Sequence, residues 1–304
     1  MARRSRRLEE QAPGLPESFR LRSVLFGRQA GARSPGGKGK ENHAIVDGRR
    51  LRPRRKRRRL QEETRELNFT FQGRPVRCLC REPRVYAVDG FLTDAEVDHL
   101  LGEARGAAFE GSYTEDDGGN RVVSEQRTST FFWLGKGADV RCRAIEARAA
   151  ELLGLHAECV EPLQIVSYTE GQHFDVHHDA GTWNEETGAV EGACSPLRIA
   201  TLFVYLNDLP EGEGRTEFPA LGLSVQPRRG MAVLWPNVDA RGVPEPRTIH
   251  KACPVAAGQR KFGCNVWITD SNLSGLALLP KPKKKKKKKK KKKGGGKRSK
   301  GASG

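Results

Sequence analysis

The sequence has no apolar run long enough to cross a membrane. No segment approaches the roughly 20 apolar residues that a transmembrane helix needs. Residues 1–10 contain several arginines, but no apolar stretch follows them, so no secretory signal is visible. We therefore predict a soluble chain without a membrane span.

Closely paired cysteines are also missing. The chain has seven cysteines, an odd number, without the tight pairing of a disulfide scaffold or the repeated Cys-x-x-Cys of a zinc site. This excludes the small disulfide-rich and zinc-ribbon classes and leaves the redox compartment open. We interpret most of these cysteines as small buried residues or free thiols.

Acidic residues are scarce at both ends of the chain. Residues 1–60 contain 19 Lys and Arg against 5 Asp and Glu, and residues 271–304 contain 15 against none. The whole chain contains 55 Lys and Arg and 37 Asp and Glu. Residues 61–270 therefore contain 21 basic and 32 acidic residues, a net charge of −11. We predict a basic disordered region over 1–80, one folded domain over 81–270 and a Lys-rich disordered tail over 271–304.

Two basic runs stand out in these flanks. Residues 52–59 read Arg-Pro-Arg-Arg-Lys-Arg-Arg-Arg, which is typical of a nuclear localisation signal or a nucleic-acid-binding patch, or of a solvated linker with no dedicated partner. Residues 283–293 are an unbroken lysine run that like-charge repulsion keeps extended. We expect it to hold RNA or another acidic partner without reading sequence.

The first half of the folded region combines strands and helices. A strand pattern begins near Arg84. Thr93 and Glu96 then form a capping box that predicts the start of a helix. One face of this helix is apolar and consists of Val97, Leu100, Leu101 and Ala104. A further strand follows Arg127. A second helix is predicted over 138–153, ended by Gly154, with a buried stripe of Val140, Ile145, Ala149 and Leu152.

From residue 160 onward the pattern is one of short strands separated by turns. The predicted strands are 163–168, 173–179, 198–206, 223–226, 231–236, 248–250 and 261–269. The fold class is therefore mostly β with flanking helices (α+β). We predict a double-stranded β-helix, or jelly roll, with the N-terminal helices packed on one sheet.

Residues 168–179 bring imidazoles and carboxylates together. Residues two apart on a strand point to the same face, so His177 and Asp179 can reach one metal ion while His178 points away. His250 is the best candidate for a third ligand. Two histidines and one carboxylate on one side of an ion are typical of non-heme Fe(II) oxygenases. A second His-x-Asp at His173 and Asp175 is interpreted, like His178, as surface groups or groups around the ligands.

Three blocks of residues resemble the prolyl 4-hydroxylases of the 2-oxoglutarate and Fe(II)-dependent dioxygenases, over about residues 83–268. The blocks are Tyr168-x-x-Gly171-Gln172-x-Phe174-x-x-His177-x-Asp179, then Arg198-Ile-Ala-Thr201-Leu-Phe-Val-Tyr205-Leu-Asn-Asp208 with Thr216-Glu-Phe218-Pro219, then Pro227-Arg-Arg-Gly230 with His250-Lys-Ala-Cys253-Pro254-Val255 and Trp267-Ile268. Each block is weak alone, but their order and spacing together are specific.

The resemblance implies roles for individual residues. It makes His177, Asp179 and His250 the Fe(II) ligands. It makes Tyr168 and Thr201 part of the 2-oxoglutarate site, with Lys261 pairing with the distal carboxylate. One residue is inserted near Gly258 relative to the family, so Arg260 remains an alternative to Lys261. Arg127 and Trp235 are candidate substrate contacts, with structural roles as the alternative.

The resemblance also implies a reaction and its cofactors. We expect hydroxylation of prolyl residues in a protein or peptide, with Fe(II), 2-oxoglutarate, O2 and L-ascorbate as cofactors and succinate and CO2 as products. The alternatives are an oxygenase acting on another substrate such as nucleic acid, favoured by the basic tails, and a non-catalytic module with nucleic-acid-binding tails. The basic clusters indicate a nuclear or cytoplasmic location. The resemblance, in contrast, indicates the endoplasmic reticulum. The sequence leaves the oligomeric state unknown.

Overall fold

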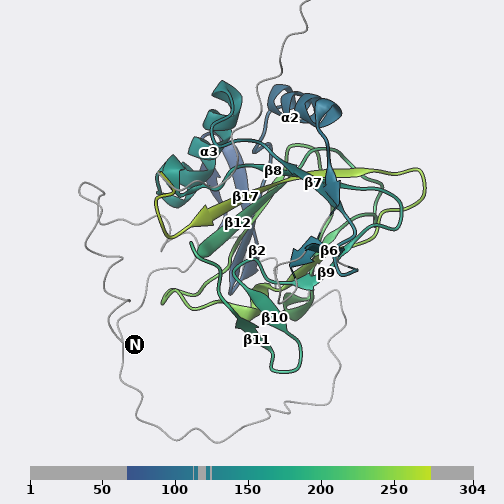
Figure 1. Ribbon diagram of the computed structural model, residues 1–304. Helices are drawn as coiled ribbons and strands as arrows, with labels where there is room; N and C mark the ends of the chain where they lie inside the picture. The colour runs from purple at the N-terminus through teal and green to yellow at the C-terminus, as the bar shows by residue number, and fades with distance from the viewer. Residues whose placement is uncertain (1–66, 112, 116–120, 124, 275–304) are drawn as a thin grey trace, which may run out of the picture.

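The computed structural model describes residues 67–111, 113–115, 121–123 and 125–274. Both predicted basic runs, 52–59 and 283–293, lie outside this part of the chain. None of the helices in these ranges is long and apolar enough to cross a membrane. The structure consists mainly of two facing β-sheets with two helices on one side (Figure 1).

The two sheets form a jelly roll. The larger, nine-stranded sheet has the spatial order β1 (Phe69–Phe71), β2 (Arg74–Arg81), β3 (Arg84–Val88), β15 (Ala232–Pro236), β12 (Arg198–Tyr205), β17 (Lys261–Thr269), β8 (Gln164–Tyr168), β7 (Thr130–Trp133), β4 (Glu110–Gly111). The smaller sheet has the order β14 (Leu223–Val225), β13 (Thr216–Phe218), β16 (His250–Ala252), β9 (Phe174–His177). From β8 onward the chain passes repeatedly between the sheets, as the predicted double-stranded β-helix requires.

Short elements complete the fold. Two hairpins stand apart from the main sheets: β5 (Tyr113–Glu115) with β6 (Arg121–Val123), and β10 (Thr182–Asn184) with β11 (Ala189–Glu191). The β10–β11 hairpin lies at the end of the molecule opposite the helices (Figure 1). Single 3₁₀ turns occur at η2 (Ala157–Cys159), η3 (Pro219–Leu221) and η4 (Pro246–Thr248).

The predicted boundary at residue 80 is wrong, because the ordered fold begins earlier. Strands β1 and β2 pair with each other, and β2 pairs with β3 at the edge of the large sheet. In β2 the side chains alternate between buried Val76 and Cys78 and exposed Arg77. The high arginine content of this segment belongs to the solvent face of a strand, which a composition argument reads as disorder.

The two helices follow the predicted caps. Helix α2 (Asp94–Gly106) begins at the capping box in which Thr93 and Glu96 bond each other's backbone N–H groups. Helix α3 (Val140–Leu153) begins at Asp139, which accepts from two N–H groups, and ends at Gly154 in the left-handed region with φ 71°. One residue of its predicted stripe is wrong: Val140 is exposed, because it is the first residue of the helix, and Cys142 takes its buried place.

Alternation along the strands of the large sheet separates two apolar cores. In β12, Ala200, Leu202 and Val204 face the core that α2 and α3 cover. Phe203 and Tyr205 face the core between the two sheets. After the register shift between Arg198 and Ala200, residues of odd number in β12 therefore point into the sandwich. The same alternation places site residues on one side or the other of their strands.

Most predicted strands after residue 160 agree with the structure, and the predicted strand 261–269 matches β17 residue for residue. The smaller sheet was harder to predict. β9 ends at His177, so Asp179 lies in the turn after the strand. β13 was not expected as a strand because its three residues hold their conformation through pairing with β14 and β16 rather than through a local pattern.

Candidate active site

His177, Asp179 and His250 lie together between the sheets, as predicted. β9 and β16 pair so that His177 stands directly opposite His250, and their ring centres are 4.2 Å apart. The Asp179 carboxylate is 3.8 Å from His177 Nε2 through Oδ1 and 3.7 Å from His250 Nε2 through Oδ2. One ligand atom from each residue lies within 4.8 Å of the others, which suits a single metal ion.

Backbone hydrogen bonds orient both imidazoles for metal binding. His177 Nδ1 donates to the Asp175 carbonyl at 2.8 Å, and His250 Nδ1 donates to the Thr248 carbonyl at 3.1 Å. With the proton on Nδ1, each Nε2 presents its lone pair to the common centre. Metal-binding histidines are typically fixed in this way by a bond from the second ring nitrogen, so the donor set fits Fe(II).

The electrostatics of the three groups favour a cation. Burial and the neighbouring His250 hold the pKa of His177 well below its usual value, so this imidazole stays neutral. Burial alone would raise the pKa of Asp179, but His250, His177 and the Thr201 hydroxyl outweigh it and lower that pKa. A neutral imidazole beside an ionised carboxylate is the protonation state that a metal ion binds.

The other histidines of this stretch have different roles. His178 is buried, and its Nε2 donates to the Glu245 carbonyl at 3.1 Å while Nδ1 accepts from Ala180 N at 3.1 Å. It therefore ties the segment of Asp179 to the loop that leads to His250. His173 lies 3.5 Å from Asp175, away from the three ligands, as the sequence reading of this second His-x-Asp suggested.

Lys261 provides a buried positive charge in the same core. Its side chain is 1% exposed, and Nζ has no hydrogen-bond partner among the described residues. Burial lowers the pKa of Lys261 to about 7. Nζ lies 5.3 to 5.5 Å from the ring centres of Tyr168, Phe203 and Tyr205. A buried cation without an acceptor fits a carboxylate ligand, so these residues suit one end of 2-oxoglutarate.

The choice between Lys261 and Arg260 follows from strand alternation. Lys261 is paired with Tyr168, which is also buried in the core between the sheets. Arg260 is exposed, bonds Ser167 Oγ at 2.9 Å and lies over the Phe262 ring. Gly263 makes room for the Phe203 ring, with which a Cβ at this position would clash. Of the two candidates, Lys261 is therefore the one that lies in the core between the sheets.

Thr201 lies beside the metal ligands rather than beside Lys261. Its hydroxyl donates to Asp179 Oδ2 at 2.6 Å and accepts from Asn237 Nδ2 at 2.8 Å. The Thr201 hydroxyl proton is therefore donated to Asp179, the carboxylate of the predicted iron site. The contact of Thr201 with 2-oxoglutarate stays a prediction, and Thr201 has in Asn237 a partner that the sequence did not indicate.

Arg127 is packed against the site through aromatic rings. Its guanidinium lies 4.8 Å from the Phe174 ring centre and 5.0 Å from that of Phe131, and it donates to Gln164 Oε1 at 3.1 Å. The Phe174 ring in turn stacks on the His177 imidazole, with centres 3.5 Å apart. These contacts give Arg127 a structural role; its substrate role stays a prediction.

Trp235 is a core residue next to an iron ligand. Its side chain is 1% exposed, and its ring centre is 4.6 Å from that of His250. Phe218 packs against both rings. This agrees with the core alternative of the sequence reading more than with a substrate platform at the surface.

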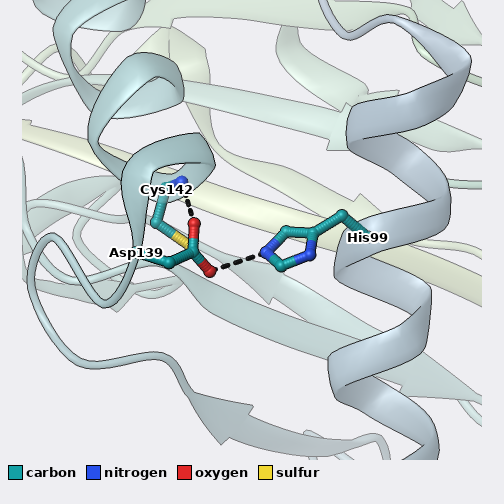
Figure 2. A group of neighbouring side chains, drawn as sticks. All are labelled: His99, Asp139 and Cys142. Carbon is teal, nitrogen blue, oxygen red and sulfur yellow. Dashed lines mark hydrogen bonds and ion pairs between the residues drawn. The ribbon is translucent and has the colours of Figure 1, made fainter.

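A second group of potential ligands lies between the helices (Figure 2). His99 of α2, Asp139 and Cys142 approach one another, with His99 Nε2 2.7 Å from Asp139 Oδ2. Arg141 lies 3.4 Å from His99 Nδ1, and an arginine only donates, so Nδ1 is the acceptor and the proton is on Nε2. Burial raises the pKa of the Cys142 thiol to about 12. The bond between His99 and Asp139 links α2 to the start of α3, and we call this group the helix clamp.

Some residues of the site carry no sequence signal on their own. Asn237 and Gln164 reach the site through contacts between segments that are far apart in the sequence. Phe174 was part of the recognised motif, but its stacking on His177 was not expected. Asn237 follows Trp235-Pro236, and only its position after a strand end would have drawn attention to it.

Comparisons with known proteins agree with this geometry. The family model of the 2OG-Fe(II) oxygenase superfamily matches residues 163–269, the range from β8 to β17 that contains the three ligands and Lys261. One solved structure to which the chain is similar is the viral collagen prolyl hydroxylase vCPH of Paramecium Bursaria Chlorella virus-1 in its 2OG complex. It is 26% identical, with a TM-score of 0.48 over 60% of this chain and 94% of that chain.

Two curated relatives from Arabidopsis thaliana match about two thirds of this chain. Prolyl 4-hydroxylase 2 is 30% identical over 64% of this chain and 69% of its own length. Probable prolyl 4-hydroxylase 6 is 33% identical over 66% of this chain and 75% of its own length. The chain therefore belongs to the prolyl 4-hydroxylase family of the 2OG-Fe(II) oxygenases, and it is a dioxygenase that uses Fe(II) and 2-oxoglutarate.

Proposed function

We propose that this dioxygenase hydroxylates prolyl residues in a protein or peptide. The observation that carries the proposal is the joint presence of His177, Asp179 and His250 around one point and of the unpartnered ammonium of Lys261 in the same core. The relatives that match the folded region are named prolyl 4-hydroxylases, which supports proline as the target.

Different residues of this chain would bind Fe(II) and 2-oxoglutarate. His177, Asp179 and His250 would hold Fe(II), and Lys261 would pair with the distal carboxylate of 2-oxoglutarate. Together, bound Fe(II) and 2-oxoglutarate use one O2 to convert 2-oxoglutarate to succinate and CO2 and to place one oxygen atom on a substrate C–H bond. The apolar rings around Lys261 and His250 exclude water from the site, which strengthens each charge interaction within it.

Tyr168 lies beside the Lys261 ammonium, and its hydroxyl forms a hydrogen bond with the Ser129 side chain. Tyr168 is buried, and burial raises its pKa, so the phenol stays protonated and can donate to an anionic ligand. A protonated phenol next to a buried ammonium gives the co-substrate carboxylate two donors of different type. We propose that Tyr168 and Lys261 bind 2-oxoglutarate together.

The test measures both products of the reaction. Purified full-length protein is incubated with Fe(II), ascorbate, 2-oxoglutarate and a panel of proline-rich peptides, and succinate release and peptide mass are recorded in parallel. The His177→Ala variant removes a ligand, and His173→Ala is the matched control from the neighbouring His-x-Asp. We expect one added oxygen on proline with wild type and with H173A, and none with H177A.

Other outcomes separate the alternative functions. Succinate release with unmodified peptides would reject the prolyl substrate and keep the oxygenase, and single-stranded oligonucleotides would then be tested in the same assay. The absence of succinate under every condition would contradict the catalytic function and favour a binding module.

For the basic flanks we propose binding to nucleic acid or another polyanion. The support is the segregation of charge, with basic ends around a central region of net charge −11. Lysine and arginine bind phosphates through counterion release, so the affinity should fall steeply with salt. Binding of a fluorescent RNA oligomer is compared between the wild type and variants in which lysines 283–293 or the basic residues of 52–59 are replaced by serine. Equal affinities, or no dependence on salt, would contradict this proposal.

A further inference from the structure

A chain of two hydrogen bonds runs from Asn237 through Thr201 to an iron ligand. Asn237 Nδ2 donates to Thr201 Oγ1 at 2.8 Å, and Thr201 Oγ1 donates to Asp179 Oδ2 at 2.6 Å. Both Asn237 and Thr201 are completely buried. The second bond has the length of a charge-assisted O–H···O⁻ interaction, which is stronger than a bond between neutral groups.

The Asn237 amide determines the direction of this chain. A threonine hydroxyl has one proton and can also accept. Because Asn237 donates to it, the hydroxyl acts as acceptor on that side, and its proton is available for Asp179. If the group at position 237 accepted instead, it would compete with Asp179 for the same proton.

The backbone of Asn237 holds the amide in place. Asn237 N donates to the Ile199 carbonyl at 2.9 Å, and Glu245 N donates to the Asn237 carbonyl at 3.0 Å. Asn237 directly follows β15, in which Trp235 pairs with Thr201. The sheet therefore fixes the backbone positions from which the Asn237 amide and the Thr201 hydroxyl approach each other.

Asn237 is also connected to the segment of the third ligand. The Glu245 carbonyl accepts from His178 Nε2 and from Thr248 Oγ1, and the Thr248 carbonyl accepts from His250 Nδ1. Asn237 thus lies at the point where the support of Asp179 and the loop that leads to His250 meet.

We propose that Asn237 is a positioning residue for the metal site, and that it acts through Thr201 by fixing the rotation of the Asp179 carboxylate toward the two imidazoles. This inference rests on the metal site of the proposed function. Groups that support a metal ligand contribute typically 10- to 100-fold to metal affinity, so the effect is measurable without turnover.

The test is Mn(II) binding to the metal-free full-length protein, measured by titration calorimetry. Thr201→Val, which keeps the shape and removes the hydroxyl, should weaken Mn(II) binding about 10- to 100-fold, and Thr201→Ser should retain most of the affinity. Asn237→Asp places an acceptor where the amide donates and should weaken binding about tenfold. Asn237→Ala removes the amide without adding charge and should weaken it several-fold.

The double variants show whether Asn237 acts through Thr201 or whether the two residues affect Mn(II) binding independently. In the Thr201→Val background, Asn237→Asp and Asn237→Ala should cause no further loss of Mn(II) affinity, because the hydroxyl through which they act is gone. A loss of the same factor in both backgrounds would overturn the proposal, as would unchanged affinity in the single Asn237 variants.

Controls separate this inference from the proposed function and from misfolding. If wild type does not bind Mn(II), or if Asp179→Ala binds it equally well, the metal site itself is wrong. If wild type binds and Asp179→Ala does not, the Asn237 variants decide the inference alone. Thermal unfolding followed by circular dichroism is recorded for each variant. If Asn237→Asp does not fold, the comparison between Asn237→Ala and its double variant with Thr201→Val gives the answer.

Discussion

Lys261 and Tyr168 stand opposite each other on the neighbouring strands β17 and β8, with Lys261 Nζ 5.3 Å from the centre of the Tyr168 ring. Phe203 and Tyr205 approach the same ammonium at similar distances. Aromatic faces attract a cation, but they replace only part of its lost hydration. The pocket is therefore arranged for an anion that enters from outside the chain.

Removal of this charge should weaken co-substrate binding. Lys261→Met deletes a buried charged donor, and a hydrogen bond to a charged group contributes about 1.5 to 3 kcal/mol, so the affinity for 2-oxoglutarate should fall about 10- to 100-fold. The Kd for 2-oxoglutarate is measured under anaerobic conditions with Mn(II). Arg260→Met, the same change on the exposed neighbour, should leave the Kd unaltered. A larger effect at Arg260 would reverse the assignment.

The same lysine should make the stability of the ligand-free protein depend on pH. The pKa of Lys261 is lowered from 10.5 to about 7 by burial, so between these values the unfolded chain binds the proton and the folded chain does not. Stability therefore rises with pH across this window, by an amount on the order of a few kcal/mol. Below pH 7 the folded state keeps the unfavourable buried charge.

Urea unfolding between pH 6 and pH 10 measures this effect. Lys261→Met should be more stable than wild type at pH 6, and the difference should shrink as the pH rises. Saturating 2-oxoglutarate should reduce the dependence, because its carboxylate stabilises the charged lysine. A wild-type stability that falls with pH in step with the variant would contradict the assignment.

Loss of an iron ligand should abolish metal binding without unfolding the protein. His250→Ala removes one of the two imidazoles and should weaken Mn(II) binding by more than about 100-fold, beyond the effect of supporting residues. His156→Ala, an exposed histidine that makes no side-chain cap at its 3₁₀ turn, is the control and should bind Mn(II) normally. Retained Mn(II) affinity in H250A would reject His250 as a ligand.

The helix clamp of His99 and Asp139 should contribute to stability and not to activity. Asp139 caps α3 through two N–H groups and bonds His99. Asp139→Ala should lower the free energy of unfolding by about 1 to 2 kcal/mol. Succinate release by the folded variant should be unchanged. The free energy of unfolding is also measured with added zinc. If zinc raises it for wild type and not for D139A, the helix clamp is a metal site.

The sequence predicted those features that depend on local patterns. The capping box at Thr93, the end of α3 at Gly154 and strand β17 all follow from residues a few positions apart. The set of His177, Asp179 and His250 was also predictable, because the motif of the first two is embedded in a recognisable frame and His250 has its own block.

What the sequence could not supply depends on pairing between distant strands. The choice between Lys261 and Arg260 required knowledge of which residues of β17 face the sandwich. The partner of Thr201 is 36 positions away at Asn237, and no local pattern links the two. Strand β2 was missed because its three arginines resemble the composition of the basic region before it.

The hydrogen bonds from both imidazoles to the backbone have a consequence for the thermodynamics of metal uptake. Because His177 and His250 are already oriented in the folded chain, the entropy of ordering these side chains is lost during folding rather than on binding. Metal binding should then leave the structure almost unchanged and raise the melting temperature by mass action alone. Iron can dissociate and return without any part of the jelly roll having to refold.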